Sequence, residues 1–281
     1  MPVSHYENFP VASLLLPRRL REPVEAIYWF ARSADDIADE GDHPEHWRLS
    51  GLDAYRQRLD SIAAGNVQSD ARWEALASNI RQFGLPLLPF RDLLDAFAQD
   101  VTTLRYSNFG DLQDYCRRSA NPVGRLMLHL YERTDDAAMA MSDAICTALQ
   151  LLNFCQDVAV DWQKNRIYIP QDELRAMNVA ETHIARGIVD ARWQQLFDAQ
   201  VGRAINLLRE GSRLPELLRG RARLELRAII AGGERIGGLL LATGGDVFRH
   251  RPQLGPLDWF AVGVRTVLPP RISAGAATAT P

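Results

Sequence analysis

Cysteine is scarce in this chain, with three residues in 281, and the few present have no motif spacing. Cys116, Cys146 and Cys155 form no Cys-x-x-Cys pair, so the sequence indicates neither a disulfide framework nor a zinc site. Isolated cysteines of this kind suit a reducing compartment. We therefore expect a cytoplasmic protein.

Leader and membrane-spanning segments are also missing. The start, Met1-Pro-Val-Ser-His-Tyr-Glu-Asn8, has no cationic stretch, and the apolar run after it is too short for a signal peptide. No uncharged apolar segment reaches the roughly 18 residues that a spanning helix needs. We expect no transmembrane helix.

The balance of charge excludes a further class. The formal net charge is −3, which gives no case for binding a nucleic acid. Hydrophobic content of 47% is ample for a large core. We find no linker or shift of composition before the C-terminal end. The sequence predicts one domain over 1–268 and a flexible C-terminal tail over 269–281.

Alternating strand patterns are nearly absent, whereas helical periodicity recurs between turn signals. The predicted fold class is therefore all-α. The expected helices are Pro23–Glu40, Gly51–Ala63, Asp70–Phe83, Pro89–Arg105, Asp111–Arg133, Asp136–Trp162, Gln171–Leu174, Thr182–Glu210, Pro215–Thr243 and Leu257–Val267.

Two aspartate pairs carry most of the functional information. Asp35 and Asp39 are one helical turn apart, and so are Asp157 and Asp161. The second pair lies in a mostly apolar stretch, where carboxylates rarely enter without a partner. At about 100° per residue, each pair shares a polar stripe with residues upstream. These are Tyr28 and Arg32 for the first pair, and Gln150 and Asn153 for the second.

Ion chemistry suggests what such pairs do. Magnesium prefers oxygen ligands, and one or two carboxylates usually hold it together with substrate phosphates. Two facing pairs are therefore suited to clamping one diphosphate through Mg²⁺. The basic loop after the second pair, with Lys164 and Arg166, is placed to reach phosphate oxygens. The alternative for each feature is an ordinary solvated cluster of charges.

These residues resemble a known family. Tyr28-x-x-x-Arg32-x-x-Asp35-Asp36-x-x-Asp39, Gln150-x-x-Asn153-x-x-x-Asp157-x-x-x-Asp161 and Arg166-Ile-Tyr168-Ile-Pro170 are similar to motifs of the squalene and phytoene synthases. The resemblance implies an isoprenoid synthase fold, a single helical bundle around a central apolar cavity, with both Asp motifs at its mouth.

The resemblance also implies roles for particular residues. Metal ligands would be Asp35, Asp36, Asp39, Asp157 and Asp161, with Mg²⁺ as the cofactor. Diphosphate or the metal shell would be contacted by Ser13, Arg32, Asn153, Lys164 and Arg166. The catalytic residues lining the ionisation site would be Tyr28, Tyr115, Gln150 and Tyr168.

Departures from the family pattern point to one branch. Typical members carry Arg just before the second motif and an acid just before its last Asp, where this chain has Gln156 and Val160. Fewer charges weaken the case for handling two diphosphates. The pattern resembles the hydroxysqualene synthases of bacterial hopanoid pathways, which ionise presqualene diphosphate and let water capture the cation. Asn121, which replaces a glycine, is our guess for the residue that positions this water.

Membership of this branch implies interaction partners besides the substrate, and other functions stay open. Presqualene diphosphate comes from a sister enzyme, so contact with that enzyme and transient peripheral contact with the inner membrane are expected. The same clamp would serve a squalene, dehydrosqualene or phytoene synthase, which condenses two prenyl diphosphates. A terpene cyclase has a different metal motif. A non-catalytic helical interaction protein is the remaining class.

Overall fold

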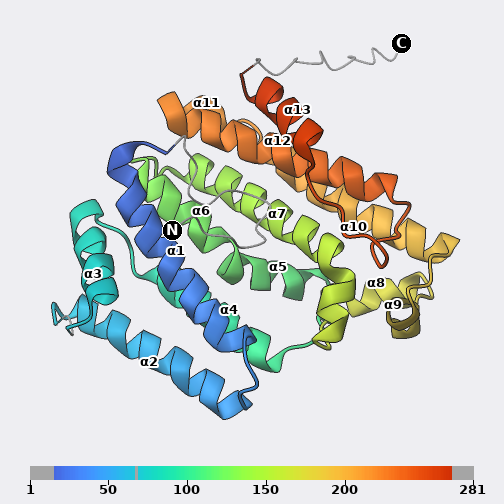
Figure 1. Cartoon of the computed structure of the whole chain (residues 1–281), viewed down its shortest axis with the longest axis horizontal. Helices are drawn as coiled ribbons and strands as arrows, with labels where there is room; N and C mark the ends of the chain where they lie inside the picture. The colour runs from blue at the N-terminus through green and yellow to red at the C-terminus, as the bar shows by residue number, and fades with distance from the viewer. Residues whose placement is uncertain (1–15, 67–68, 268–281) are drawn as a thin grey trace, which may run out of the picture.

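The computed structural model describes residues 16–66 and 69–267, and every regular element in those ranges is a helix (Figure 1). The predicted all-α class is confirmed. Ser13 and the tail at 269–281 lie outside the described residues. The helices are α1 Arg18–Asp39, α2 Glu45–Ala63, α3 Ala71–Phe83, α4 Leu88–Thr102, α5 Phe109–Ser119, α6 Asn121–Leu130, α7 Asp136–Gln163, α8 Gln171–Ala176, α9 Glu181–Arg186, α10 Ala191–Glu210, α11 Leu214–Leu217, α12 Gly220–Ala242 and α13 Pro256–Val267.

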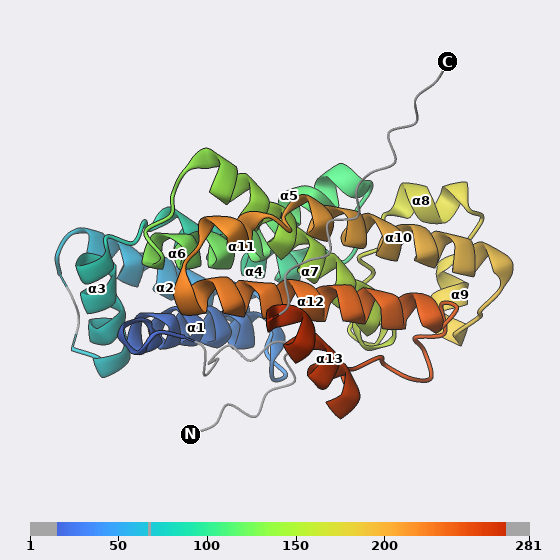
Figure 2. The same cartoon turned by 90° about the horizontal axis from the view of Figure 1, so that it is seen from above.

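Helix α7 is the central element of the bundle. It packs against α5 and α6 on one side and against α10 and α12 on the other, and both views show it inside the ring of the other helices (Figures 1 and 2). Helices α1 to α4 pack on one another around a second hydrophobic cluster. The C-terminal ends of α1 and α7 therefore approach each other from different parts of the chain.

Three long helices expected from the sequence are each divided in two. The break between α5 and α6 falls at Ala120, and Pro122, the second residue of α6, has no N–H that could continue α5. Gly187, at φ +59°, ends α9, and the Asp190 side chain caps α10 by accepting from the Trp193 N–H at 3.0 Å. Gly220, at φ +58°, stands at the turn before α12.

Two helices begin earlier than the sequence suggested. Helix α1 starts at Arg18 and contains Pro23 within its second turn. Helix α2 starts at Glu45, and the expected first residue, Gly51, lies inside it. A Cβ on Gly51 would come within 2.8 Å of the Ile37 side chain. That glycine therefore permits close packing of α1 on α2 and does not mark a helix end.

The glycines of α12 let this helix pack closely on its neighbours. A Cβ on Gly233 would lie 2.8 Å from Leu149 of α7 and 2.9 Å from Leu208 of α10, and one on Gly237 would lie 2.8 Å from Ile205. The missing side chains let α12 approach both helices closely. This contact fixes α7, which carries the second Asp pair.

By length and composition, one described helix could cross a membrane, and it is α7. Core helices of proteins without any membrane segment have the same composition, and α7 is enclosed by α5, α6, α10 and α12. It also carries Asp143, Asp157 and Asp161. We therefore describe α7 as a core helix.

Packing of α10 on α7 leads to a stability prediction. A Cβ on Gly211 would lie 2.5 Å from the Met141 carbonyl oxygen and 2.4 Å from Ile145 Cγ1, whereas one on Gly202 meets nothing within 4 Å. We expect Gly211→Ala to lower the free energy of unfolding by about 1–3 kcal/mol, since the backbone must shift. Gly202→Ala should raise it by about 0.5–1 kcal/mol through helix propensity. Urea unfolding measures both, and equal effects would contradict this packing.

Candidate active site

The two Asp motifs are joined by ion pairs between the ends of α1 and α7. Lys164 and Arg166 follow directly after α7, and both contact Asp39 in the last turn of α1. Arg166 Nη1 lies 2.6 Å from Asp39 Oδ1. Residues about 125 positions apart in sequence are thereby brought together, as the sequence analysis expected of the two stripes.

The first Asp pair is partly neutralised. Arg32 lies 3.3 Å from Asp35 and 2.7 Å from Asp36, both on α1. Burial nevertheless raises the pKa of Asp35 to about 6, and the charge of Asp39 adds to the effect. For Asp39 burial acts in the same direction, but the hydrogen bond from Lys164 and the charge of Arg166 outweigh it and lower the pKa.

The second Asp pair is divided between a paired and an unpaired carboxylate. Arg251, from the segment between α12 and α13, binds Asp157 through Nε and through Nη2, the latter at 3.2 Å. No hydrogen bond or ion pair reaches the Asp161 carboxylate from the described part of the chain. Burial and the neighbouring Asp157 raise the pKa of Asp161 to about 8. A cation bound beside Asp161 would offset the free-energy cost of burying its negative charge next to Asp157.

A pocket of about 290 Å³ opens beside this junction. Asp39, Lys164 and Arg166 line it, together with Arg48 and Asp100. Glu45 completes the charged part of the lining, and Ala38, Val101 and Leu104 form its apolar part. The charged part suits an anionic group of a ligand.

Asp100 of α4 is a candidate site residue that the sequence analysis missed. Its side chain is 7% exposed and accepts hydrogen bonds from Tyr115 Oη at 2.7 Å and from Tyr168 Oη at 3.4 Å. Arg166 Nη2 also donates to the Asp100 carbonyl oxygen, at 3.1 Å. Burial raises the pKa of Asp100 to about 7. The pattern of α4 gave no signal, because Asp100 is one of many acids on amphipathic helices.

The two predicted tyrosines near the end of the site are buried in an aromatic cluster. Tyr168 stacks on Phe154 of α7 with ring centroids 3.7 Å apart, and Tyr106 and Tyr115 lie within 6 Å of the same ring. Burial raises the pKa of both Tyr115 and Tyr168 well above its ordinary value. Both hydroxyls therefore stay protonated and point at Asp100. The structure places them behind the charged junction.

The remaining predicted residues lie upstream on the same two helices. Tyr28 interacts electrostatically with Arg32 on α1. Gln150 and Asn153 are partly exposed on α7, roughly 10 Å and 6 Å from Asp157 along the helix axis. Their positions agree with the predicted stripes, and their roles stay predictions.

Gln156 and Arg251 form a second connection that local sequence patterns could not reveal. Gln156 is 2% exposed and donates from Nε2 to the Pro252 carbonyl oxygen at 2.7 Å, next to the Arg251–Asp157 pair. Both contacts span about 94–96 residues. The chain therefore places an arginine at the second motif from a distant segment, where typical family members have one at the position of Gln156.

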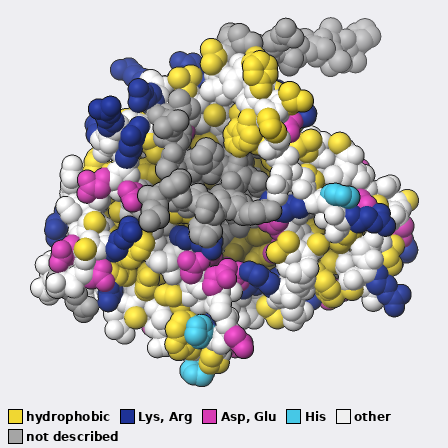
Figure 3. Space-filling view, in the orientation of Figure 1, with side chains coloured by type: hydrophobic (Ala, Val, Ile, Leu, Met, Phe, Trp, Pro, Cys, Tyr) yellow, Lys and Arg dark blue, Asp and Glu magenta, His cyan; other side chains and the backbone are white. Residues whose placement is uncertain are grey.

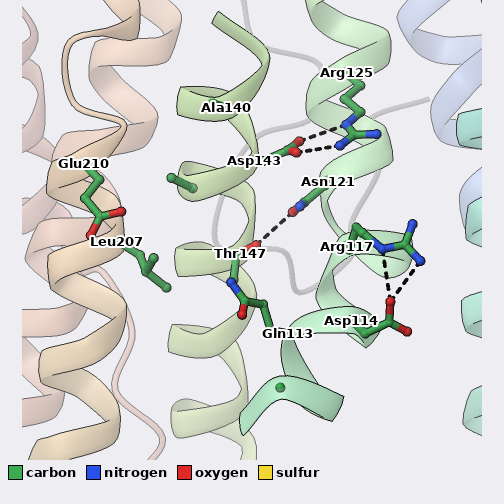
Figure 4. Close-up of a pocket in the computed structure, with 12 residues that line it drawn as sticks. Gln113, Asp114, Arg117, Asn121, Arg125, Ala140, Asp143, Thr147, Leu207 and Glu210 are labelled. Atoms are coloured by element: carbon green, nitrogen blue, oxygen red, sulfur yellow. Dashed lines mark hydrogen bonds and ion pairs between the residues drawn. The ribbon is translucent and has the colours of Figure 1, made fainter. Parts of the chain in front are cut away.

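Asn121, our guess for positioning a water molecule, lies elsewhere. Its Oδ1 accepts from Thr147 Oγ1 at 3.0 Å, in a pocket of about 490 Å³ between α5, α6, α7 and α10 (Figure 4). Thr147 precedes Asp157 by ten residues, or about 15 Å along α7, and none of the motif aspartates lines this pocket. The guess is not supported, because Asn121 faces this separate pocket.

The donor set fits magnesium held jointly with a diphosphate. Among the described residues, no group of three or more acids, histidines or cysteines could hold a metal ion alone. Mg²⁺ in such sites needs only one or two carboxylates, since phosphates and waters complete its shell. The two carboxylates suited to this have a raised pKa: Asp161, which has no direct ion pair among the described residues, and Asp35. The buried Nε atoms of Arg32 and Arg166 also have no hydrogen-bond partner in the described chain.

Comparisons with known proteins agree with this geometry. The family model described as squalene/phytoene synthase matches residues 3–258. A hydroxysqualene synthase of Zymomonas mobilis is 37% identical over 209 residues, covering 73% of this chain and 69% of the relative. A 15-cis-phytoene synthase of Synechococcus elongatus is 30% identical over 257 residues, 87% of this chain and 83% of the relative.

Solved structures identify the fold. The crystal structure of a squalene synthase from Alicyclobacillus acidocaldarius superposes with a TM-score of 0.80 at 37% identity. The match covers 86% of this chain and 90% of that chain. The predicted isoprenoid synthase fold is thereby confirmed.

The aspartates lead to a mutational prediction. We expect Asp35→Asn, Asp39→Asn, Asp157→Asn and Asp161→Asn each to lower turnover of a prenyl diphosphate by about 10² or more, the usual loss for one preorganised electrostatic contact. Helical circular dichroism should be unchanged. Asp143→Asn, on the same helix α7 but paired with Arg125 in the other pocket, is the control and should keep activity. Near-normal turnover in two of the four variants would remove the clamp.

The raised pKa values predict a pH dependence. Unfolded aspartates titrate near 3.8, whereas Asp35 and Asp161 titrate near 6 and 8 in the fold. The native state therefore binds more protons between pH 4 and 8, and without metal its stability should fall as pH rises through that window. Magnesium needs the deprotonated carboxylates, so the rise in Tm that it causes should be larger at pH 8 than at pH 6.

The variant Asp161→Asn separates the contribution of Asp161 to this pH dependence from that of the other acidic residues. The amide stays neutral, so the metal-free variant should melt above the parent at pH 8 and close to it at pH 5. Differential scanning calorimetry with and without magnesium chloride measures both. Equal magnesium shifts at the two pH values would contradict the assignment.

Proposed function

Because the chain belongs to the squalene/phytoene synthase family, we propose that it is a hydroxysqualene synthase. The substrate would be presqualene diphosphate, and the products would be hydroxysqualene and diphosphate. The observation that carries this proposal is the junction of α1 and α7, where Lys164 and Arg166 bind Asp39 beside the unpaired Asp161.

Two observations support a hydroxysqualene synthase over a condensing enzyme: the residues at positions 156 and 160, and a similar protein of that name. A protein named hydroxysqualene synthase is 37% identical to this chain. Gln156 is engaged with the Pro252 carbonyl and Val160 is 45% exposed, so neither position supplies the charge typical of the family. Arg251 brings an arginine to this motif from a distant segment, so the charge that the motif lacks is the acid at position 160. One carboxylate fewer suits one diphosphate better than two.

Asp35, Asp39, Asp157 and Asp161 would hold Mg²⁺, with Asp36 turned toward Arg32. Bound magnesium supplies charge neutralisation for a diphosphate leaving group and lowers the cost of breaking its bond to carbon. The chain's own cations add to this. Lys164 and Arg166 line the pocket with Asp39 and can exchange that carboxylate for phosphate oxygens.

The reaction balances without a redox cofactor. The carbon–oxygen bond of presqualene diphosphate breaks, and the electron pair leaves with diphosphate. The cyclopropylcarbinyl cation rearranges, and the oxygen of one water molecule forms the new carbon–oxygen bond. That water loses one proton to solvent or to the released diphosphate. No nicotinamide is consumed.

The buried tyrosines have a supporting role in this scheme. Tyr115 and Tyr168 hold Asp100 from one side while Arg166 binds its carbonyl oxygen, so the Arg166 guanidinium is fixed in place. The stacked rings of Tyr168 and Phe154 exclude bulk water behind the charged junction. Both hydroxyls stay protonated, so they donate hydrogen bonds and do not act as bases.

A second function is favoured by other relatives. The 15-cis-phytoene synthase matched over 87% of this chain supports condensation of two prenyl diphosphates on the same clamp. A condensing enzyme would begin from farnesyl or geranylgeranyl diphosphate. Product analysis with each substrate separates the two functions.

We expect presqualene diphosphate with magnesium to give a C30 alcohol without reduced nicotinamide, and farnesyl diphosphate alone to give almost nothing. In heavy-oxygen water the label should enter the product hydroxyl, because the nucleophile comes from solvent. Mass spectrometry of the extracted product reads both results. Unlabelled alcohol, or squalene formed only with reduced nicotinamide, would return the chain to the condensing members of the family. The Asp157→Asn variant is the negative control.

A further inference from the structure

Helix α13 is apolar on two opposite faces. Its inner face packs on α12 through Val262 and Thr266, which are 3% and 6% exposed. The two charged residues of α13 both point toward α12, where Asp258 lies 2.5 Å from Arg235 and Arg265 lies 3.0 Å from Glu234. The charges of this helix are therefore used in attaching it to the bundle.

The outer face of α13 carries no charge at all. At 100° per residue, its outward side chains fall within an arc of roughly 120°. Leu257 is 84% exposed, and Phe260 and Val267 are each 73% exposed. A surface helix normally has polar residues on this side. The outward residues, which we call the apolar stripe, are Leu257, Phe260, Ala261, Val264 and Val267.

A ridge of arginines continues from this stripe along α12. Arg223 and Arg227 are four residues apart on α12 and so share one face, and Arg219 lies directly before the helix. Arg227 Nη2 donates to the Arg265 carbonyl at 3.5 Å, which places the ridge next to the C-terminal end of α13. Arg219 and Arg223 are exposed or partly exposed and have no ion-pair partner among the described residues.

The space-filling view agrees with this arrangement. Hydrophobic side chains gather over α13 at the top of the molecule, and Lys and Arg side chains gather at the upper left of the same face (Figure 3). Figure 2 shows α13 on the outside of the bundle, beyond α12 and away from α5. The stripe and the ridge therefore belong to one outward surface.

We propose that this surface docks on a bilayer that contains anionic lipids. An apolar stripe with flanking arginines is the composition of helices that lie in the membrane interface, and the arginines complement anionic headgroups. A stable dimer is a poorer fit, because a standard interface uses about 20–30 residues on each side, whereas the stripe offers five on one short convex helix. The proposal rests on α12 and α13 and does not depend on the proposed function.

Flotation with vesicles tests the docking surface in the full-length protein. One set of vesicles is pure phosphatidylcholine, and the other contains a third phosphatidylglycerol. We expect binding to the anionic vesicles that weakens about fivefold for each arginine removed in Arg219→Gln and Arg223→Gln, the fold-change of about 1 kcal/mol per residue. High salt should reproduce this loss. The double variant Leu257→Ser with Phe260→Ser should lose at least about tenfold.

Controls make the outcome specific. Leu88→Ser removes a 63% exposed apolar side chain at the start of α4 and should bind like the parent. Thermal unfolding by circular dichroism checks that each variant is folded. No binding of the parent to either vesicle would overturn the proposal, and so would unchanged binding of the serine variant. A concentration-dependent dimer in sedimentation that the serine variant abolishes would assign the stripe to a second copy of the chain instead.

Discussion

The whole site depends on a single electrostatic constraint, the cost of holding four carboxylates close to one another at two helix ends. Like charges so close repel, and burial strengthens the repulsion. The chain offsets part of it with Arg32 on α1, with Lys164 and Arg166 after α7, and with Arg251. The Asp161 carboxylate has no direct ion pair among the described residues, and the charges of Arg166 and Lys164 compensate its burial in part. On the proposed function, the carboxylates would accept a cation and the arginines the anion that comes with it.

Local sequence patterns were sufficient for most of the fold. Helical periodicity and capping residues depend on neighbours in sequence, and the all-α class follows from them. The helix divisions at Pro122, Gly187 and Gly220 were missed because a good helical pattern continues across them. The opposite error occurred at Gly51, where the sequence predicted a helix start. Helix α2 continues through this glycine because it packs against Ile37 of α1.

The candidate site was predictable in part. The two Asp stripes could be recognised because each lies on one helix with a regular spacing. Asp100 and Arg251 could not, since their partners lie far away in sequence: Asp100 binds Tyr115 and Tyr168, and Arg251 binds Asp157. The net charge of −3 similarly conceals the arginine ridge of α12, because it averages over the whole surface.

The Arg251–Asp157 pair has a consequence for how the chain is made. During synthesis, α1 to α7 can pack once about 163 residues have emerged, and domains generally fold from the N-terminal side. Asp157 has no arginine partner until the segment after α12 appears, 94 residues later. A nascent chain therefore carries both Asp motifs in an incomplete charge arrangement. Translation of the segment between α12 and α13 completes this charge arrangement.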